Sequence, residues 1–219
     1  MNRLAIFDCD GTLVDSQHSI WRGLDTAFTA AGRETPPPEQ ARRIVGLSLV
    51  EAMQALLPED ERAVHVDLAE RYKQAFSDLR ATGLVEEPLF EGVAELLDGL
   101  EADGWLLGVA TGKSDRGLGL CLDCHGLGNR FVTLQTADRH PSKPHPSMIE
   151  QAMADAGAGP AGTLMIGDTS YDMAMARAAG VTAVGVAWGY HPASELRDAG
   201  AHMVASHPRD ILEFAREHA

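Results

Sequence analysis

Short apolar segments alternate with helical patterns along this chain of 219 residues, and this alternation sets the fold class. Such runs, closed by polar residues or glycine, are typical of strands that are buried on both faces of a sheet. Where helices separate the strands, the connections are right-handed crossovers and the strands lie parallel. The predicted strands are Leu4–Phe7, Trp105–Ala110, Phe131–Leu134, Thr163–Ile166 and Thr182–Val186, with His202–Ala205 as a weaker edge strand. The sequence therefore predicts an α/β protein with a parallel sheet.

The segment between the first two predicted strands has only helical patterns. Its expected helices are Ser16–Ala31, Glu39–Val45, Ser48–Leu57 and Glu59–Ala81, with Pro58 at the start of the last. The helices expected between and after the later strands are Val93–Leu100, Asp115–Cys124, Pro146–Ala156, Met173–Ala179 and Ile211–Glu217. We therefore predict a core domain made of residues 1–14 and 85–219, and a helical domain of residues 15–84 inserted between its parts.

Polar residues follow three of the predicted strands. Asp8 and Asp10 follow the first strand, Thr111 follows the second, and Asp168 follows the strand that begins at Thr163. Ligands of parallel α/β sheets bind outside the carboxyl ends of the strands. These side chains are therefore expected to meet at one edge of the sheet. Cys9, between the two aspartates, is expected to point the other way, into the core.

Two carboxylates at alternate positions of a strand end point the same way and repel each other. A divalent metal, a lysine or a shared proton could offset that repulsion at Asp8 and Asp10. Asp10-Gly11 could also be a simple turn, but a turn leaves Asp8 unexplained. Our functional hypothesis makes Asp8 a nucleophile that forms an aspartyl-phosphate. Asp10 would then protonate the leaving alkoxide and later deprotonate the attacking water.

Asp168 and Asp172 lie four residues apart at the start of a helix. They could be ordinary acidic residues that interact with the helix dipole, or ligands of a metal together with Asp8. An all-carboxylate set fits Mg²⁺ better than Zn²⁺. Lys143, with prolines on both sides, could be a surface lysine or a cation positioned to neutralise Asp8 and a phosphate.

The stretch from Thr111 to Ser114 ends a strand and opens a helix. Ser114 could cap that helix, while Thr111 and the backbone at Gly112 could hold phosphate oxygens. The pattern from Cys121 to His125 matches a c-type haem attachment motif. We reject haem attachment because the chain begins with no export signal, and we expect Cys121 and Cys124 to be ordinary helix residues.

Composition and charge argue against several classes of partner as the default. The formal net charge of −14 argues against nucleic acid and against an anionic membrane surface. We find no apolar segment long enough to span a bilayer and no signal peptide at the N-terminus. Three cysteines in a chain of this length do not indicate a disulfide framework. We therefore expect a cytoplasmic protein.

Together these motifs resemble the haloacid dehalogenase (HAD) superfamily along the whole chain. The stretch from Asp8 to Ser16 resembles its first motif, Thr111 its second, Lys143 its third, and the stretch from Gly167 to Asp172 its fourth. The helical segment resembles the small cap of the subgroup that contains phosphoglycolate phosphatases and β-phosphoglucomutases. The resemblance implies a Rossmann-like, HAD-like parallel sheet core with an inserted small helical cap domain.

The resemblance also implies a Mg²⁺ cofactor and roles for individual residues. The catalytic residues would be Asp8, Asp10, Thr111 and Lys143, and the metal would be held by Asp8, the backbone carbonyl of Asp10, Asp168 and Asp172. Phosphoryl and substrate contacts would come from Gly11, Thr12, Thr111, Gly112, Lys143, Arg43 and Gly46. The last two lie in the cap, where Arg42 and Arg43 could also belong to a solvated helix face.

We therefore predict a Mg²⁺-dependent phosphatase that hydrolyses a small phosphate monoester, phosphoglycolate-like or a sugar phosphate. The expected partner is a small phosphorylated metabolite, and the expected assembly is a monomer or weak homodimer, without nucleic acid or membrane. A phosphohexose mutase would use the same aspartyl-phosphate with a sugar hydroxyl in place of water. A non-catalytic binding or regulatory protein on the same fold is the alternative from another class.

Overall fold

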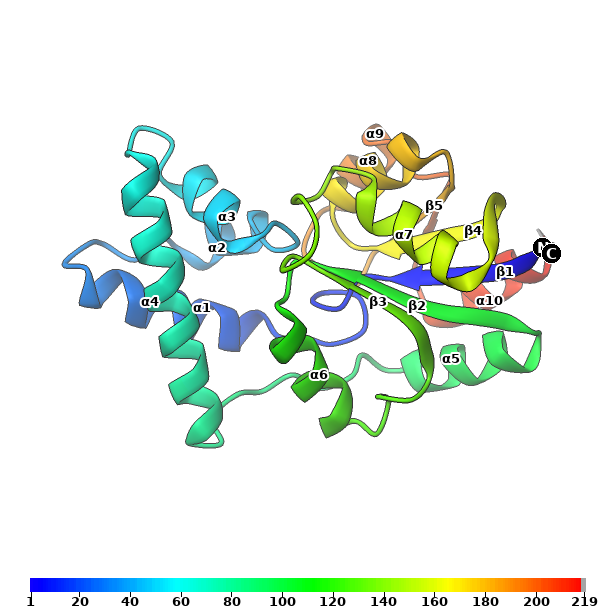
Figure 1. Ribbon diagram of the computed structural model, residues 1–219, viewed down its shortest axis with the longest axis horizontal. Coiled ribbons are helices and arrows are strands. Elements are labelled where there is room, and N and C mark those ends of the chain that lie inside the picture. The colour runs from blue at the N-terminus through cyan, green and yellow to red at the C-terminus, as the bar shows by residue number, and fades with distance from the viewer. Residues whose placement is uncertain (218–219) are drawn as a thin grey trace.

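The computed structural model describes residues 1–217, which form a parallel sheet with helices on both faces and a further group of helices beyond the carboxyl ends of the strands (Figure 1). Within this range the sheet has six strands in the order β3-β2-β1-β4-β5-β6, and all neighbouring strands are parallel. The strands are β1 (Asn2–Phe7), β2 (Trp105–Thr111), β3 (Phe131–Thr136), β4 (Ala158–Gly167), β5 (Thr182–Val186) and β6 (Met203–Ala205). The predicted α/β fold class is confirmed.

Strand β1 lies at the centre of the sheet, and the chain changes direction around it. β2 and β3 extend the sheet on one side, whereas β4 to β6 extend it on the other. Phe7 is level with Val109 of β2 and with Ile166 of β4. Open α/β sheets bind ligands at such a switch point. The residues that follow β1, β2 and β4 therefore lie together where a ligand is expected.

The side chains of β1 alternate between two hydrophobic cores. Ala5, Phe7 and Cys9 face one core, and Leu4 and Ile6 face the other. Cys9 is fully buried, as predicted, because residues two apart in a strand share a face. The first core is covered by α5 (Val93–Ala102), α6 (Asp115–Cys124) and α10 (Pro208–Glu217), and the second by α7 (Ser147–Ala156), α8 (Ser170–Ala179) and α9 (Ala193–Asp198).

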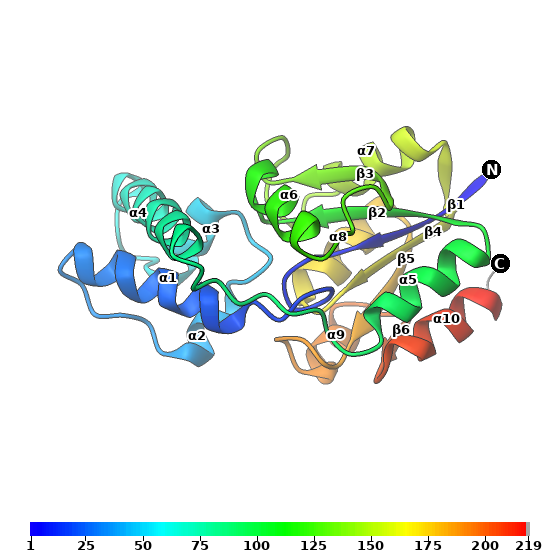
Figure 2. The same ribbon diagram turned by 90° about the horizontal axis from the view of Figure 1, so that it is seen from below.

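The helical group packs around a third hydrophobic cluster of its own, which includes Leu24, Phe28, Met53 and Leu68. Its helices are α1 (Gln17–Ala30), α2 (Pro38–Arg43), α3 (Leu49–Leu56) and α4 (Arg62–Ala81). Figure 2 shows this group set apart from the sheet and joined to it by two stretches of chain. No helix within residues 1–217 has the length and apolarity needed to cross a bilayer.

The two connecting stretches run antiparallel and side by side. The amide of Asp15 donates to the carbonyl of Pro88 at 2.8 Å, and the amide of Phe90 donates to the carbonyl of Leu13 at 3.1 Å. An isolated bridge pairs Val14 with Leu89. The chain therefore leaves the sheet and returns to it at the same place.

Several predicted helix boundaries differ from the structure. The long helix was predicted to start at Pro58–Glu59, and this start is wrong, because α4 begins only at Arg62. The residues before it form a turn, in which the amide of Asp60 donates to the carbonyl of Leu57 at 3.1 Å. Helix α2 ends at Arg43 rather than Val45, because the chain passes through turns to Gly46, whose φ is +95°. Helix α9 was not expected.

Candidate active site

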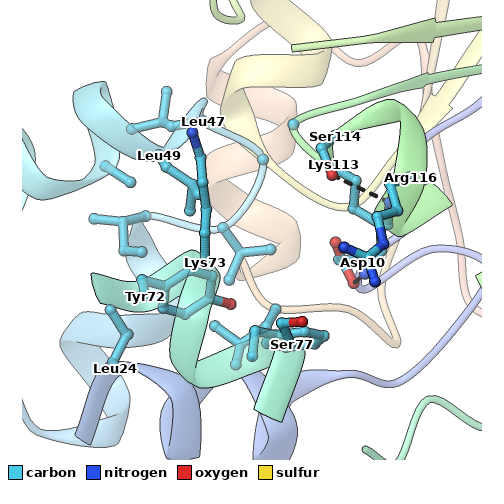
Figure 3. Close-up of a pocket in the computed structure, with 18 of the residues that line it drawn as sticks. Asp10, Leu24, Leu47, Leu49, Tyr72, Lys73, Ser77, Lys113, Ser114 and Arg116 are labelled. Atoms are coloured by element: carbon cyan, nitrogen blue, oxygen red, sulfur yellow. Dashed lines mark hydrogen bonds and ion pairs between the residues drawn. The ribbon is translucent and has the colours of Figure 1, made fainter. Parts of the chain in front are cut away.

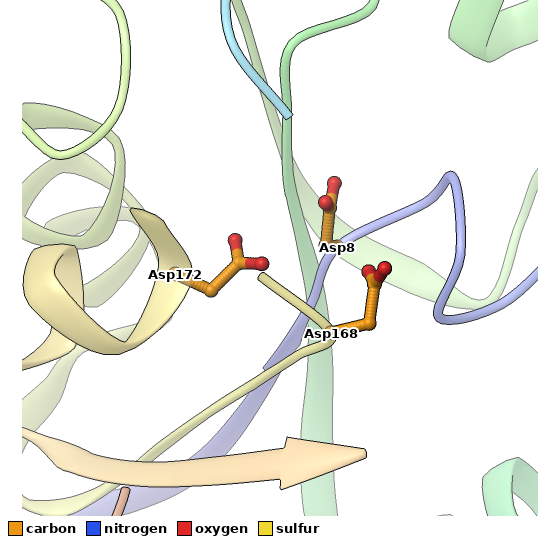
Figure 4. Close-up of side chains that lie close together, drawn as sticks. All are labelled: Asp8, Asp168 and Asp172. Atoms are coloured by element: carbon orange, nitrogen blue, oxygen red, sulfur yellow. The ribbon is translucent and has the colours of Figure 1, made fainter. Parts of the chain in front are cut away.

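Three buried carboxylates meet at the switch point of the sheet. Asp8 follows β1, Asp168 follows β4, and Asp172 lies in the first turn of α8 (Figure 4). One oxygen of each lies within 4.8 Å of the others. Burial raises the pKa of Asp8 to about 7, although Lys143 acts in the opposite direction. The pKa of Asp168 is raised well above its usual range by burial and by the negative charges of Asp8 and Asp172. The cluster therefore needs positive charge to stay fully ionised.

Lys143 supplies part of that charge. Its ammonium lies 3.0 Å from Asp8 Oδ1 and 2.7 Å from Asp172 Oδ1, and its side chain is completely buried. Burial alone disfavours a charged lysine, but Asp172 and Asp8 outweigh burial and raise the pKa of Lys143 above its usual value. The lysine is therefore a fixed cation inside the protein and not a surface residue.

Asp168 is held by the two loops that follow β1 and β5. The hydroxyl of Thr12 donates to Asp168 Oδ1 at 2.9 Å, and the amide of Tyr190 donates to Oδ2 at 2.9 Å. Trp188 fixes the two loops to each other, because its indole N–H donates to the carbonyl of Thr12 at 3.2 Å. Gly11 has a φ of +82° and lies directly against the carboxylate of Asp168, so a side chain there would be strained and would collide.

Asp172 is fixed by the cap of its own helix. The amide and hydroxyl of Thr169 donate to Asp172 Oδ2 at 3.0 and 2.7 Å, and the amide of Asp172 donates back to the Thr169 hydroxyl at 3.3 Å. This reciprocal arrangement is a capping box. It engages Oδ2 and leaves Oδ1 for Lys143. Asp172 can therefore cap α8 with one oxygen and belong to the buried charged cluster with the other.

Asp10 is not part of the three-carboxylate cluster and makes its own set of contacts. Its Oδ1 accepts a hydrogen bond from the hydroxyl of Ser16 and lies 2.9 Å from the ammonium of Lys113. Lys113 also lies 2.7 Å from Glu87 Oε1, and Arg80 lies 2.6 Å from Glu87 Oε2. Burial opposes ionisation of Glu87, but Lys113 and Arg80 outweigh it and lower the pKa of this carboxyl. Glu87 and Lys113 together hold the Asp10 side chain in place.

Replacing Glu87 with Gln is expected to destabilise the fold by about 1.5–3 kcal/mol at pH 7, because charged hydrogen bonds to Lys113 and Arg80 are lost. The pKa of Glu87 is lowered in the folded protein from its usual 4.5. Its contribution is therefore complete above that value and is lost as the pH falls through the lowered pKa. Urea unfolding of both proteins at several pH values measures the difference. A difference that grows toward low pH would contradict this assignment.

The stretch after β2 contacts the helical group directly. Thr111 is buried at the end of β2, and Ser114 caps α6 by accepting from the amide of Gly117 at 3.1 Å, as predicted for Ser114. A Cβ on Gly112 would lie 2.6 Å from the carbonyl oxygen of Leu47 and 2.9 Å from that of Gly46. The missing side chain of Gly112 therefore lets the loop before α3 approach the sheet.

Replacing Gly112 with Ala is expected to lower kcat/KM about tenfold or more, because the loop at Gly46–Leu47 must move away from the site and small displacements are costly in catalysis. The free energy of unfolding should fall as well, because the atoms that the new Cβ would meet belong to the backbone and a backbone segment must be displaced. Steady-state kinetics and urea unfolding test the two parts. Gly119, where a Cβ would meet nothing within 4 Å, provides the matched Ala variant.

The predicted cap contacts have different positions. Gly46 faces the site, and a Cβ there would lie 3.9 Å from Asp8 Oδ2. Arg43 lies at the outer edge, where its guanidinium pairs with Glu195 at 2.7 Å and its carbonyl accepts from the Tyr171 hydroxyl at 3.1 Å. The roles predicted for Gly46 and Arg43 in substrate binding stay predictions.

A cavity of about 530 Å³ lies between the helical group and the sheet, and Asp10 lines it together with Gly46, Gly112 and Lys113. Figure 3 shows Tyr72, Lys73 and Ser77 of α4 on one side and Asp10, Lys113 and Arg116 on the other. The cavity therefore opens onto Asp10 from the side of the helical group.

This arrangement matches a known family. Residues 5–186 match the haloacid dehalogenase-like hydrolases. The chain belongs to this family. The prediction of an enzyme is confirmed: the protein is a hydrolase of the phosphatase type, as its relatives and structural neighbours indicate.

Three similar proteins illustrate the relationship. The probable phosphatase IndB of Dickeya dadantii is 38% identical, with 98% of this chain and 94% of that protein covered. A phosphoglycolate phosphatase of Pseudomonas putida is 30% identical, with 96% of this chain and 78% of that protein covered. The crystal structure of a hydrolase from Pseudomonas syringae superposes with a TM-score of 0.85 at 27% identity and covers 99% of each chain.

The sequence patterns missed several residues that support this HAD site. Lys113 adjoins the predicted Thr111-Gly112 pair, so its position in the second motif was a usable signal. Glu87 lies in a linker, and no motif or pattern in the neighbouring sequence marks it as part of a site. Ser16 occupies the N-cap position of α1, but its side chain makes no capping hydrogen bond and donates to Asp10 instead.

Proposed function

We propose that the protein hydrolyses the phosphate monoester of a small molecule through an aspartyl-phosphate on Asp8, with Mg²⁺ as cofactor. The observation that carries this proposal is the buried cluster of Asp8, Asp168 and Asp172 beside Lys143. The relatives named phosphoglycolate phosphatase make phosphoglycolate one candidate substrate.

The residues of the cluster fit a magnesium ion. Asp8 Oδ2 is buried and has no hydrogen-bond partner among the described residues, although the other oxygen of Asp8 accepts from the Cys9 amide at 2.6 Å. Among residues 1–217, Lys143 is the single cation within ion-pair distance of the three carboxylates. Carboxylate oxygens are the ligands that Mg²⁺ prefers. When bound there by Asp8, Asp168 and the backbone carbonyl of Asp10, with Asp172 in support, the ion would neutralise the carboxylates and the phosphoryl oxygens.

In the first step, the ionised carboxylate of Asp8 attacks phosphorus, and the bond between phosphorus and the ester oxygen breaks. Asp10 donates a proton to that oxygen, so the product leaves as a neutral alcohol. Lys143 lowers the cost of keeping Asp8 ionised and neutralises the phosphoryl group as it is transferred. Thr111 and the backbone around Gly11, Thr12 and Gly112 would hold the phosphoryl oxygens.

In the second step, Asp10 takes a proton from a water molecule that attacks phosphorus. The acyl-phosphate bond breaks, inorganic phosphate leaves, and Asp8 is regenerated as a carboxylate. The same side chain therefore acts as acid and then as base. Lys113 and Ser16, both bound to Asp10 Oδ1, would keep its carboxyl group at a fixed position through the two steps.

We further propose that residues 15–84 act as a cap domain on a core of residues 1–14 and 85–219. Closure would exclude bulk water while the ester is cleaved. A contact between the helical group and the core supports this role, since the amide of Ser48 donates to the hydroxyl of Ser142, the residue before Lys143, at 2.9 Å. A cytoplasmic location and a monomer or weak homodimer stay predictions.

Phosphate release from a panel of esters, with Mg²⁺ and with EDTA, tests the proposed function. The panel includes phosphoglycolate, sugar phosphates and nucleotides. We expect release that depends on Mg²⁺ and a melting temperature that Mg²⁺ raises even without substrate. Transfer to a second sugar hydroxyl without phosphate release would identify a mutase instead, and folded protein that binds Mg²⁺ but cleaves no ester would refute the proposal.

A further inference from the structure

The cavity beside Asp10 lies on the leaving-group side of the site. If Asp10 protonates the ester oxygen, as the proposed function requires, the alcohol of the substrate must extend from Asp10 away from Asp8. The cavity of about 530 Å³ begins at Asp10 and extends between α1, α3, α4 and α6. Its volume falls in the range of about 300–1,000 Å³ that is typical of pockets for drug-sized ligands. A two-carbon acid such as glycolate would leave most of this volume unfilled.

The walls of the cavity are mainly apolar. Helix α1 contributes Ile20 and Leu24, the segment around α3 contributes Leu47 and Met53, and Leu120 lies on the opposite side in α6. A carbohydrate hydroxyl facing these side chains would lose its hydrogen bonds to water without replacement. The walls therefore favour an apolar alcohol over a sugar.

Helix α4 adds an aromatic surface to the cavity. The rings of Tyr72 and Phe76 lie 5.7 Å apart between centroids, and both residues line the cavity. The cations of Arg80 and Lys113 lie 5.6 and 5.8 Å from the Phe76 ring, where they help to fix it. A planar ring in the substrate can pack against this pair in an offset or edge-to-face arrangement.

The charged groups around the cavity offer little to a carboxylate. Lys113 and Arg80 are already paired with Glu87, and Lys73 is paired with Glu70 at 2.7 Å. Of the cations that line the cavity in the described part of the chain, Arg116 alone has no ion-pair partner, and it is exposed at the edge. A charged acid would therefore not find a free buried cation in the cavity.

Two hydroxyl groups complete the lining. The phenol of Tyr72 and the hydroxyl of Ser77 make no hydrogen bond within residues 1–217. Figure 3 shows both residues on the α4 wall of the cavity, across from Asp10. Pockets for organic ligands typically combine apolar walls with a few such polar groups that fix orientation. These hydroxyls can accept or donate one or two hydrogen bonds to an otherwise apolar ligand.

From these features we infer that the substrate, within the proposed phosphatase function, is the phosphate monoester of a bulky, uncharged, mainly apolar alcohol that carries an aromatic ring. The phosphoryl group lies at Asp8 and Lys143, and the ring lies between α4 and α6. Phosphoglycolate is a poor substrate because its carboxylate enters an apolar cavity without a free buried cation.

The test compares kcat/KM for 2-phenylethyl phosphate, ethyl phosphate, glucose 6-phosphate and 2-phosphoglycolate. Ethyl phosphate is the matched control, since it has the same primary alkyl ester without the ring. We expect 2-phenylethyl phosphate to exceed each of the others at least about tenfold, a factor that corresponds to burying about two methylene-sized groups.

The location of the ring is tested by filling the cavity. Ser77→Phe and Leu120→Trp, from opposite walls, should each lower the ratio of kcat/KM for 2-phenylethyl phosphate to that for ethyl phosphate by about tenfold. Leu120 is 40% exposed, so its replacement does not depend on repacking a core. Gln74→Phe adds the same ring as Ser77→Phe on the exposed side of α4 and should leave the ratio unchanged.

The outcomes separate the inference from the function on which it rests. Hydrolysis of none of these esters or of those in the wider panel would refute the phosphatase proposal and the inference with it. Equal or higher kcat/KM for ethyl phosphate, phosphoglycolate or glucose 6-phosphate would overturn the inference alone. A ratio unchanged in both Ser77→Phe and Leu120→Trp would show that the ring does not bind in this cavity.

Discussion

Replacing Asp8 with Asn is expected to lower kcat for phosphate release at least about a thousandfold, because an amide cannot act as the nucleophile that forms the acyl-phosphate. The change keeps the shape of the side chain and leaves Lys143 paired with Asp172. The loss should therefore appear in turnover and not in folding. Rapid acid quench with a radiolabelled ester should trap phosphoprotein in the unmodified protein and none in this variant.

The same variant makes a second prediction about stability. Asp8 lies in a buried cluster where burial and its acidic neighbours raise its pKa to about 7. Removing one negative charge from the cluster should leave the melting temperature in EDTA unchanged or higher, whereas the increase caused by Mg²⁺ should shrink. Asp198→Asn, at an exposed position, is the control for both assays. Near-normal turnover by the Asp8 variant would exclude Asp8 as the nucleophile.

Replacing Lys143 with Met is expected to destabilise the fold by about 3–5 kcal/mol in EDTA, because breaking a buried ion pair leaves uncompensated charge inside the protein. Here the side chain is fully buried and contacts both Asp8 and Asp172. For a domain of this size the loss corresponds to a drop in melting temperature of roughly 6–20 °C. Turnover should also fall strongly, since the proposed mechanism relies on this cation to neutralise the transferred phosphoryl group.

Mg²⁺ distinguishes this electrostatic effect from simple loss of packing. Bound Mg²⁺ should restore part of the stability of the Lys143 variant, because it neutralises the same carboxylates. Lys73→Met, at an exposed lysine paired with Glu70, should change stability by less than about 1 kcal/mol. An equal loss in both lysine variants, or a loss in the Lys143 variant that Mg²⁺ does not reduce, would contradict this account.

The parts of the fold that could be predicted depend on local patterns. Both faces of β1 are covered, so all residues of Leu4–Phe7 are buried and apolar. A continuous apolar segment of this kind predicts a buried strand from the sequence alone. Parallel strands then force the residues after them to one edge, which is why Asp8, Thr111 and Asp168 could be expected together before any coordinates. The capping role of Ser114 could also be predicted, because the helix cap involves only residues within three positions of it.

The parts that could not be predicted depend on contacts between distant segments. Glu87 reaches Lys113 across 26 positions of the chain, and nothing near Glu87 marks it as different from other linker carboxylates. The pairing of Arg43 with Glu195 likewise depends on α9, a helix that the pattern did not predict. The size and lining of the cavity also follow from how α1, α3, α4 and α6 pack, which no single segment determines.

The antiparallel pairing of the two connecting stretches has a consequence for how such proteins diversify. Asp15 is hydrogen-bonded to Pro88 and Phe90 to Leu13, so the two ends of the inserted helical segment are held to each other next to the sheet. The entropy of closing that loop rises only slowly with its length, and the sheet therefore tolerates inserts of very different size at this point. Under the proposed function, descendants of one chain could exchange the whole insert, and with it the molecules they accept, while the proposed catalytic residues of the sheet stay where they are.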